Sequence, residues 1–419
     1  MRYHHFFYLA ACVVFGACAT KNSGHGNDSG QVATVDVASS FDNPVQLSAS
    51  QLGSKITFVP LETTDTSLIS NNYLITVTDR NVVVSNFGSE SNVLVFDRNS
   101  GRFLNHIGQF GGGPDDFRNP YHLIDSKGSR IFLRPASGSG LMAFTPDGKP
   151  SGKILETINM SFYPNTVISD SLAWLGGMKD ANDDRGETLR MATMSGEVID
   201  SVRIFGNQKL AAPFPNSFTG KTDYKYFIPI LGDPLQSVAQ VTNNGMTYVN
   251  FQPVIYRVGN RIKLRETLCD TIYNVTPDGW SHSIIFDMGK HRFPIEDLNT
   301  RTPSSSHLFV TDMAETESKL LFGLSEGWPM DDNHTEYIGI FDKASGTTSI
   351  GRASDAIKDD ISGFISFIPS HTSTDGAFVG FISPEEVITW REEHPDSKLP
   401  AWVSRLKSDD NPVMVIVSE

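Results

Sequence analysis

The sequence predicts an all-β fold of the β-propeller type, on three observations. Short apolar runs of strand length recur roughly every 8–12 residues between turn residues, with no long helical periodicity. An aromatic residue followed by a turn rich in Asp, Ser and Gly recurs along the chain. A strand-like run stands at each extreme of the expected folded part, at Ile56–Val59 and Val413–Val417. Together these features favour a closed ring of four-stranded sheets over a sandwich or a barrel.

The repeating unit is clearest in the stretch 93–117. An apolar run, Val93–Phe96, is followed by the polar turn Asp97–Gly101, in which Gly101 is free to adopt a positive φ. Apolar residues resume at Phe103. The segment therefore predicts a β-hairpin, which is half of a four-stranded antiparallel sheet.

Further copies of this aromatic-then-turn unit lie at Phe144–Lys149, Met194–Glu197, Tyr273–Gly279 and Phe341–Gly346. Phe144 follows Phe96 by 48 residues (144 − 96), and Met194 follows Phe144 by 50 (194 − 144), which are blade lengths in propellers. The two later intervals, 79 (273 − 194) and 68 (341 − 273), are longer. We expect an additional blade around Phe227–Val258 and inserted loops such as His291–Leu308.

A glycine run follows the first hairpin, at Gly111–Pro114. It predicts a sharp, exposed connection between two blades. A phosphate-binding loop is the alternative interpretation, but it requires a following helix and a suitably placed Lys, Ser or Thr, and the sequence supplies neither.

The two ends of the folded part are expected to meet. If Ile56–Val59 and Val413–Val417 share one blade, or lie in neighbouring blades, backbone hydrogen bonds close the ring and cover edges that would otherwise aggregate. Short helices are predicted near the C-terminus. One begins after a possible N-cap, Ser383, and covers Pro384–Glu393, and a second covers Pro400–Lys407.

Residues 1–17 resemble a bacterial lipoprotein signal peptide. The apolar run Phe6–Phe15 is too short to span a bilayer as a helix. Phe15–Cys18 resembles a lipobox, which implies that Cys18 is acylated and becomes the new N-terminus. A plain secretory signal with an incidental Cys is the alternative. Because Ala19 is not Asp, the resemblance implies an outer membrane lipoprotein of the cell envelope, with the periplasmic or surface face left open.

The remaining chain divides into a flexible tether, 18–44, and a folded body, 45–419. The tether is polar and rich in Gly and Ser, without apolar periodicity. After processing, Cys269 is the only thiol apart from the lipidated one, so no intramolecular disulfide is expected. The formal net charge of −14 argues against a nucleic-acid partner, because phosphate binding requires a basic surface.

Candidate chemical groups occur without a recognised spacing. Acidic pairs, which suit Ca²⁺ binding or acid–base catalysis but more often lie in solvated loops, are Asp183–Asp184, Asp331–Asp332, Asp359–Asp360 and Asp409–Asp410. The histidines lack metal-site spacing and are His106, His122, His282, His291, His307, His334, His371 and His394. Aromatic residues that suit either ligand stacking or blade packing are Phe214, Phe218, Tyr224, Tyr226, Phe227, Tyr248, Phe251 and Tyr256. We therefore predict no catalytic residue, metal ligand or cofactor-binding residue.

Several motifs resemble those of the six-bladed β-propeller lipoproteins of Bacteroides and related Bacteroidetes. They are the opening Phe58–Asp65, the hairpin Val95–Gly101 with Ile107–Phe117, the strand Cys269–Tyr273 and the closing Asn411–Val413. Asp115 and Asp116 stand where that family more often has Gly and Glu. The resemblance covers most of residues 45–419 and implies six blades and a distant kinship with NHL-like propellers. It implies no reaction.

Two functions remain open from the sequence. The first is a non-catalytic, lipid-anchored propeller that binds a glycan, a peptide or an envelope protein at the mouth of its central channel. The second is a metal-dependent enzyme of the propeller lyase or lactonase type, with Ca²⁺ or Zn²⁺ held at the channel by residues from different blades. Ligands of that kind are distant in sequence, so no motif is required.

Overall fold

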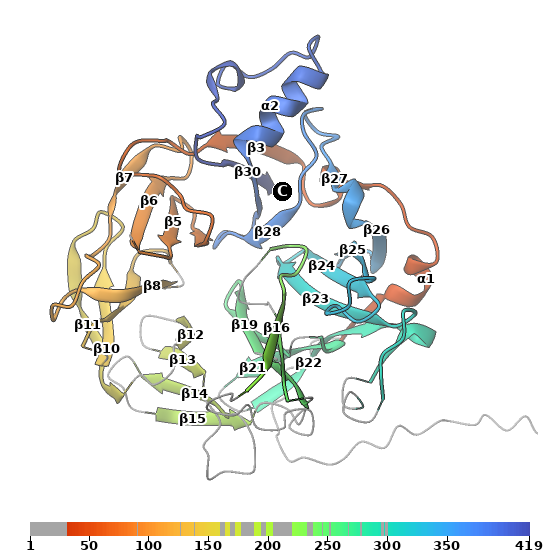
Figure 1. The fold of residues 1–419 in the computed structure, drawn as a ribbon, viewed down its shortest axis with the longest axis horizontal. Coiled ribbons are helices and arrows are strands. Elements are labelled where there is room, and N and C mark those ends of the chain that lie inside the picture. The colour runs from red at the N-terminus through yellow and green to blue at the C-terminus, as the bar shows by residue number, and fades with distance from the viewer. Residues whose placement is uncertain are drawn as a thin grey trace, which may run out of the picture.

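The fold is described from a computed structural model. It describes residues 32–419 except 90, 126, 138, 160–163, 168–171, 177–187, 194–197, 204–219, 233–237, 245, 251–252, 267, 277–278, 295–296 and 298–300. Most of its strands belong to antiparallel sheets arranged radially around a common centre (Figure 1). The all-β propeller expected from the sequence is therefore confirmed.

Five sheets are four-stranded and antiparallel. The first contains β4 (Tyr73–Val77), β5 (Asn81–Asn86), β6 (Asn92–Asp97) and β7 (Phe103–His106). The second contains β8 (Phe117–Ile124), β9 (Ile131–Pro135), β10 (Ser139–Phe144) and β11 (Pro150–Asn159). The third contains β12 (Pro164–Val167), β13 (Leu172–Gly176), β14 (Thr188–Thr193) and β15 (Val198–Arg203).

The remaining two four-stranded sheets come from the C-terminal part. One contains β23 (Leu308–Glu315), β24 (Lys319–Glu326), β25 (Thr335–Asp342) and β26 (Thr347–Arg352). The other contains β28 (Pro369–Thr372), β29 (Phe378–Ile382), β30 (Val413–Ser418) and, from the start of the chain, β3 (Lys55–Pro60).

A five-stranded sheet departs from this pattern. Its antiparallel strands are β19 (Pro253–Val258), β20 (Arg261–Glu266), β21 (Thr271–Thr276) and β22 (Gly279–Asp287). The fifth strand, β1 (Ala33–Asp36), pairs with β22 in parallel. The expected number of six four-stranded blades is therefore corrected to five, because an N-terminal strand extends this sheet.

The ring closes as the sequence predicted. Strand β3 pairs antiparallel with β30, and Ile56 lies opposite Val417 while Val59 lies opposite Met414. A buried cluster then joins this sheet to the first one, with Val379 and Val82 among its members. The two ends of the body thus share one blade.

The recurring aromatic marks the same position in several blades. Phe144 is the last residue of β10, and Phe96 and Phe341 are the next-to-last residues of β6 and β25. Each of these is the third strand of its sheet, and the turn that follows leads into the fourth strand. Gly101 in the first of these turns has φ +71, and a Cβ there would collide with the carbonyl oxygen of Pro60. The copy at Met194–Glu197 lies outside the described residues.

The long interval between repeats contains an insertion, and the extra blade expected at 227–258 is wrong. The insertion is a three-stranded sheet made of β16 (Thr222–Phe227), β17 (Val238–Asn243) and β18 (Met246–Asn250). It packs on loops of the β23–β26 sheet through a buried cluster that includes Phe227, Val238 and Trp328. The segment expected as inserted loops, His291–Leu308, does connect β22 to β23.

The expected tether boundary at residue 44 is also corrected. Residues 33–41 form β1 and a short helix, α1 (Val37–Phe41), and the side chains of Val35 and Val37 are fully buried. Their burial against the five-stranded sheet explains why this polar-looking segment is ordered. Further along the chain, β2 (Leu47–Ser48) pairs in parallel with β27 (Ile357–Lys358) and is followed by a 3₁₀ turn (Ala49–Gln51). Leu47, Ala49 and Ile357 are buried in another cluster.

Helix α2 (Pro384–Glu393) is confirmed, with a capping box between Ser383 and Glu386. The second helix expected at Pro400–Lys407 is wrong, because only a 3₁₀ turn at Val403–Arg405 forms there. Other 3₁₀ turns cover Gly289–His291 and Ala353–Asp355. No helix among the described residues has the length and apolar character needed to cross a membrane.

The glycine run is confirmed as a connection between blades. It lies between the end of β7 and the start of β8. The Asp116 carboxylate folds back over it and accepts a hydrogen bond from the Gly113 amide at 2.7 Å.

Candidate ligand-binding cavity in the central channel

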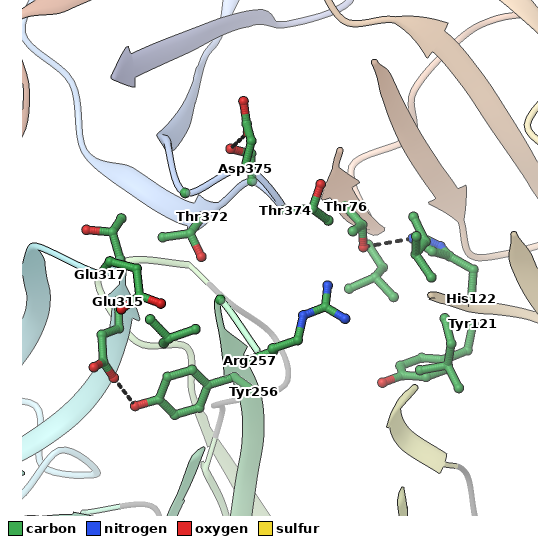
Figure 2. A pocket seen from close by; sticks show the side chains of 18 residues that line it. Thr76, Tyr121, His122, Tyr256, Arg257, Glu315, Glu317, Thr372, Thr374 and Asp375 are labelled. Atoms are coloured by element: carbon green, nitrogen blue, oxygen red, sulfur yellow. Dashed lines mark hydrogen bonds between the residues drawn. The ribbon is translucent and has the colours of Figure 1, made fainter. Parts of the chain in front are cut away.

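A cavity of about 340 Å³ lies where the innermost strands of several sheets converge (Figure 2). Its lining comes from β4, β8, β19, β23 and β28 and from the loops that follow them, and it includes Thr76, Tyr121, His122, Tyr256, Arg257, Glu315, Glu317, Thr372, Thr374 and Asp375. A neighbouring cavity of about 200 Å³ shares Thr76, Arg257 and Thr372 and adds His371. The channel therefore brings together side chains that are separated by up to 301 residues in the sequence (375 − 74).

The local strand geometry places these residues. Strands β4, β8, β19, β23 and β28 lie nearest the centre of the ring, and residues near their C-terminal ends line the shared space. Thr76 is the fourth residue of β4, Arg257 is the fifth of β19 and Glu315 is the last of β23. The site therefore forms because the first strands of different blades bring these side chains to the same part of the ring.

Arg257 occupies the middle of this cavity. Its side chain extends from β19, and the guanidinium lies between the Tyr256 side and the His122 side of the lining (Figure 2). Burial lowers the pKa of Arg257, while the carboxylate of Asp125 acts in the opposite direction. An arginine side chain stays protonated far above neutral pH, so the group remains a cation there.

Glu315 is fully buried and is held by two lysines and a tyrosine. Lys343 Nζ lies 2.7 Å and Lys263 Nζ lies 3.3 Å from Glu315 Oε1. The hydroxyl of Tyr256 donates to Glu315 Oε2 at 2.5 Å. Burial alone would raise the pKa of Glu315, but the two lysines outweigh it and the pKa is lowered. Burial and the nearby Glu315 raise the pKa of Tyr256 well above its ordinary value.

The other acidic residues of the lining also have cationic partners. Arg98 Nη1 lies 2.7 Å from Asp375 Oδ2, and Arg261 forms an ion pair with Glu317. Each of the three carboxylates in the described lining is therefore paired with an arginine or lysine outside the lining. Arg257 brings a positive charge into the cavity itself.

His122 connects the cavity to the blade behind it. Its ring is fully buried, and burial lowers its pKa to about 3, so the imidazole is neutral. Nδ1 lies 2.6 Å from Ser85 Oγ, and Nε2 lies 2.9 Å from Thr76 Oγ1. Ser85 in turn donates to the carbonyl oxygen of Pro120 at 2.5 Å.

The direction of each hydrogen bond from Thr76 to Pro120 follows from the Pro120 carbonyl group, which ends the series. A carbonyl oxygen only accepts, so the single Ser85 hydroxyl proton goes to Pro120. His122 Nδ1 must then donate to Ser85, which leaves Nε2 as the acceptor of the Thr76 hydroxyl proton. On the cavity side, Thr76 Oγ1 is left with lone pairs that accept.

The candidate residues from the sequence are mostly dispersed. Of the eight singled-out histidines, only His122 and His371 line the two cavities. Among the described residues, no group of three or more His, Cys, Asp or Glu side chains is placed to hold a metal ion. Cys18 lies outside the described residues.

The acidic pairs have local structural roles or exposed positions. Asp359 is buried and accepts hydrogen bonds from the amides of Ile361, Ser362 and Phe364. Asp331 and Asp332 are exposed on a turn, and the pair Asp183–Asp184 lies outside the described residues.

The predicted aromatic cluster divides into different environments. Tyr224 and Tyr226 are exposed on the inserted sheet, and Phe227 is buried beneath it. Among those whose side chains the structure describes, Tyr256 alone lines the channel cavity. The positions of Phe214, Phe218 and Phe251 lie outside the described residues.

Sequence reasoning missed Thr76, Arg257 and Glu315. They come from different blades and share no motif. Their common signal is a polar residue near the end of the first strand of a blade, and finding it requires correct blade boundaries. The misplaced blade at 227–258 put Arg257 at the end of a blade instead of at its start.

Known proteins resemble this chain in fold and in family. No curated protein sequence matches it. A solved structure of a protein from Bacteroides fragilis, described as exported, superposes with a TM-score of 0.60 at 15% identity, covering 92% of this chain and 99% of that one. A DUF4221 family member from Bacteroides vulgatus gives a TM-score of 0.40 at 9% identity, covering 87% and 96%. Residues 32–418 match the model of a family described as Domain of unknown function (DUF4934), and the chain therefore belongs to the DUF4934 family.

Proposed function

We propose that this protein is a non-catalytic propeller of the cell envelope that binds a small ligand in its central channel. The observation that carries the proposal is the cavity of about 340 Å³, which five innermost strands line and into which Arg257 projects. Clefts and cavities with a few convergent polar groups are the usual form of ligand sites in proteins. The rigid ring around it would hold those groups in place without a conformational change.

The proposed location rests on the N-terminus. The apolar run and the lipobox-like Phe15–Cys18 support export and acylation at Cys18, and hence an outer membrane lipoprotein. The similar Bacteroides fragilis protein, described as exported, supports an envelope location. Mass spectrometry of the mature protein tests this, because acylation adds a defined mass that Cys18→Ser removes. A wild-type protein cleaved elsewhere and free of lipid would refute the anchor.

We also propose that the ring has six sectors, as in the NHL-like lipoproteins that the sequence resembles. In this arrangement β19–β22 serve as the sixth blade, with β1 as an added outer strand. Its support is that β19 contacts β12 on one side while β1 contacts β26 on the other. An experimentally determined structure with five sectors around the axis would refute the proposal.

A cavity-filling substitution tests the binding function. Thr372→Trp places an indole in the channel, whereas Thr347→Trp places one on an exposed outer strand and serves as the matched control. A thermal-shift screen of sugars, sugar acids, amino acids and short peptides should give hits that Thr372→Trp loses and the control keeps. If the wild-type protein gives no hit, or if both variants keep every hit, channel binding is refuted.

The metal-dependent lyase or lactonase that the sequence left open is distinguished by elemental analysis. Our proposal expects purified protein without a stoichiometric metal ion. A Ca²⁺ or Zn²⁺ content near one per chain, lost together with an activity on chelation, would contradict a non-catalytic role.

A further inference from the structure

We infer that the ligand carries a carboxylate and neighbouring hydroxyl groups, as an acidic sugar does. The inference rests on the proposed channel-binding function and narrows it to one chemical class. Three features of the cavity lead to it: the cation at its centre, the acceptor fixed at its wall and its size.

The central cation selects for an anionic group. The guanidinium of Arg257 lies in the middle of the cavity and presents a planar set of donors that matches a carboxylate in a bidentate arrangement (Figure 2). The carboxylates in the lining already interact with Lys263, Lys343, Arg98 and Arg261. The Asp125 carboxylate also acts on Arg257. A ligand carboxylate beside the guanidinium would add a further charge-assisted interaction in a partly buried setting.

The fixed acceptor selects for a donor on the same ligand. The hydrogen bonds from Thr76 through His122 to Ser85 consume the Thr76 proton on the side away from the cavity. Thr76 Oγ1 can then only accept from a ligand. A simple carboxylate has no proton to give at neutral pH, whereas a sugar hydroxyl has one. A ligand that uses both the Arg257 donors and the Thr76 acceptor therefore needs a carboxylate and a hydroxyl group.

The cavity size sets the scale of the ligand. A volume of about 340 Å³ is near the lower limit of ordinary ligand sites, which run from about 300 to 1,000 Å³. One sugar unit suits this space better than an extended chain. The hydroxyl-bearing residues Thr372, Thr374 and Tyr121 complete the lining and provide further hydrogen-bonding groups.

Isothermal titration calorimetry with three probes tests the inference. D-glucuronate carries both functions, D-glucose carries only the hydroxyls, and propionate carries only the carboxylate. We expect glucuronate to bind at least about tenfold more tightly than either of the others, since a hydrogen bond to a charged group contributes about a factor of ten or more.

Variants assign the two contacts. Arg257→Gln should weaken glucuronate binding about 10- to 100-fold, and Arg257→Lys, which keeps the charge but loses the planar set of donors, should weaken it less. Thr76→Val should weaken it about 2- to 10-fold. Arg102→Gln, at an exposed turn between outer strands, is the matched control and should bind as the wild type does. Thermal melting of each variant verifies folding.

These outcomes distinguish failure of the acidic-sugar inference from failure of the proposed channel-binding function. Equal affinity for glucuronate and glucose, no glucuronate binding, or unchanged affinity in Arg257→Gln overturns the acidic-sugar inference. In each of these cases channel binding still stands if another ligand from the screen is lost in Thr372→Trp. A screen in which no ligand of any charge depends on the cavity overturns both.

Discussion

Acidification should destabilise this protein through one buried histidine. The pKa of His122 is lowered to about 3 by burial, against 6.5 for an ordinary histidine. Below pH 6.5 the unfolded chain takes up a proton at this residue, whereas the folded chain does not until about pH 3. Stability is therefore fully present above pH 6.5 and is lost as the pH falls from 6.5 towards 3.

The magnitude follows from the two pKa values. The difference between 6.5 and about 3 corresponds to roughly 5 kcal/mol of unfolding free energy, fully lost only near pH 3. At pH 5, where most of the proton uptake by the unfolded chain has occurred, the loss is roughly 2 kcal/mol. This loss is a substantial fraction of the unfolding free energy of a typical domain, which is about 5–15 kcal/mol.

Urea unfolding at several pH values between 7.5 and 5 measures the effect. His122→Asn removes the titrating ring, so its stability should fall by roughly 2 kcal/mol less than that of the wild type over this range. The cavity that the substitution leaves lowers the stability at every pH and does not alter the slope. His394→Asn, at an exposed position, is the matched control and should keep the wild-type slope. Identical slopes for His122→Asn and the wild type would refute the reasoning.

Three further changes test the fold. Deletion of residues 412–419 removes β30, whose Val413, Val415 and Val417 are fully buried, so cooperative thermal unfolding should be lost; a truncated protein as stable as the full chain would contradict ring closure. Glu315→Gln leaves Lys263 and Lys343 near a neutral group and should lower the unfolding free energy by about 3–5 kcal/mol. The control Glu385→Gln, exposed on α2, should leave the midpoint of urea unfolding unchanged. Gly363→Ala should cost about 1–2 kcal/mol for its positive φ, and Gly101→Ala should cost more because its Cβ also meets Pro60; equal losses in urea unfolding would contradict the close approach.

The sequence predicted the features that local chemistry determines. The hairpin turn at Asp97–Gly101 needs a glycine with positive φ, and such turns repeat because each blade needs the same reversal. Closure by Ile56–Val59 with Val413–Val417 followed from two apolar runs that both need a partner. Helix α2 followed from its capping box at Ser383.

The sequence failed where tertiary contacts decide the structure. Residues 33–41 look like part of a polar linker, yet pairing of β1 with β22 and burial of Val35 make them part of the fold. The strands of the inserted sheet have the length and antiparallel pairing of blade strands, so strand-length runs alone could not distinguish 222–250 from a blade. The cavity was not predictable because Thr76 and Arg257, which lie far apart in the sequence, line the same cavity only in the closed ring.

A crystal structure determined with saturating D-glucuronate tests the central claim most directly. We predict ligand density in the channel cavity, with its carboxylate on the guanidinium of Arg257 and a hydroxyl directed at Thr76 Oγ1. An empty channel, or a ligand bound only on the outer surface of the ring, would contradict the account.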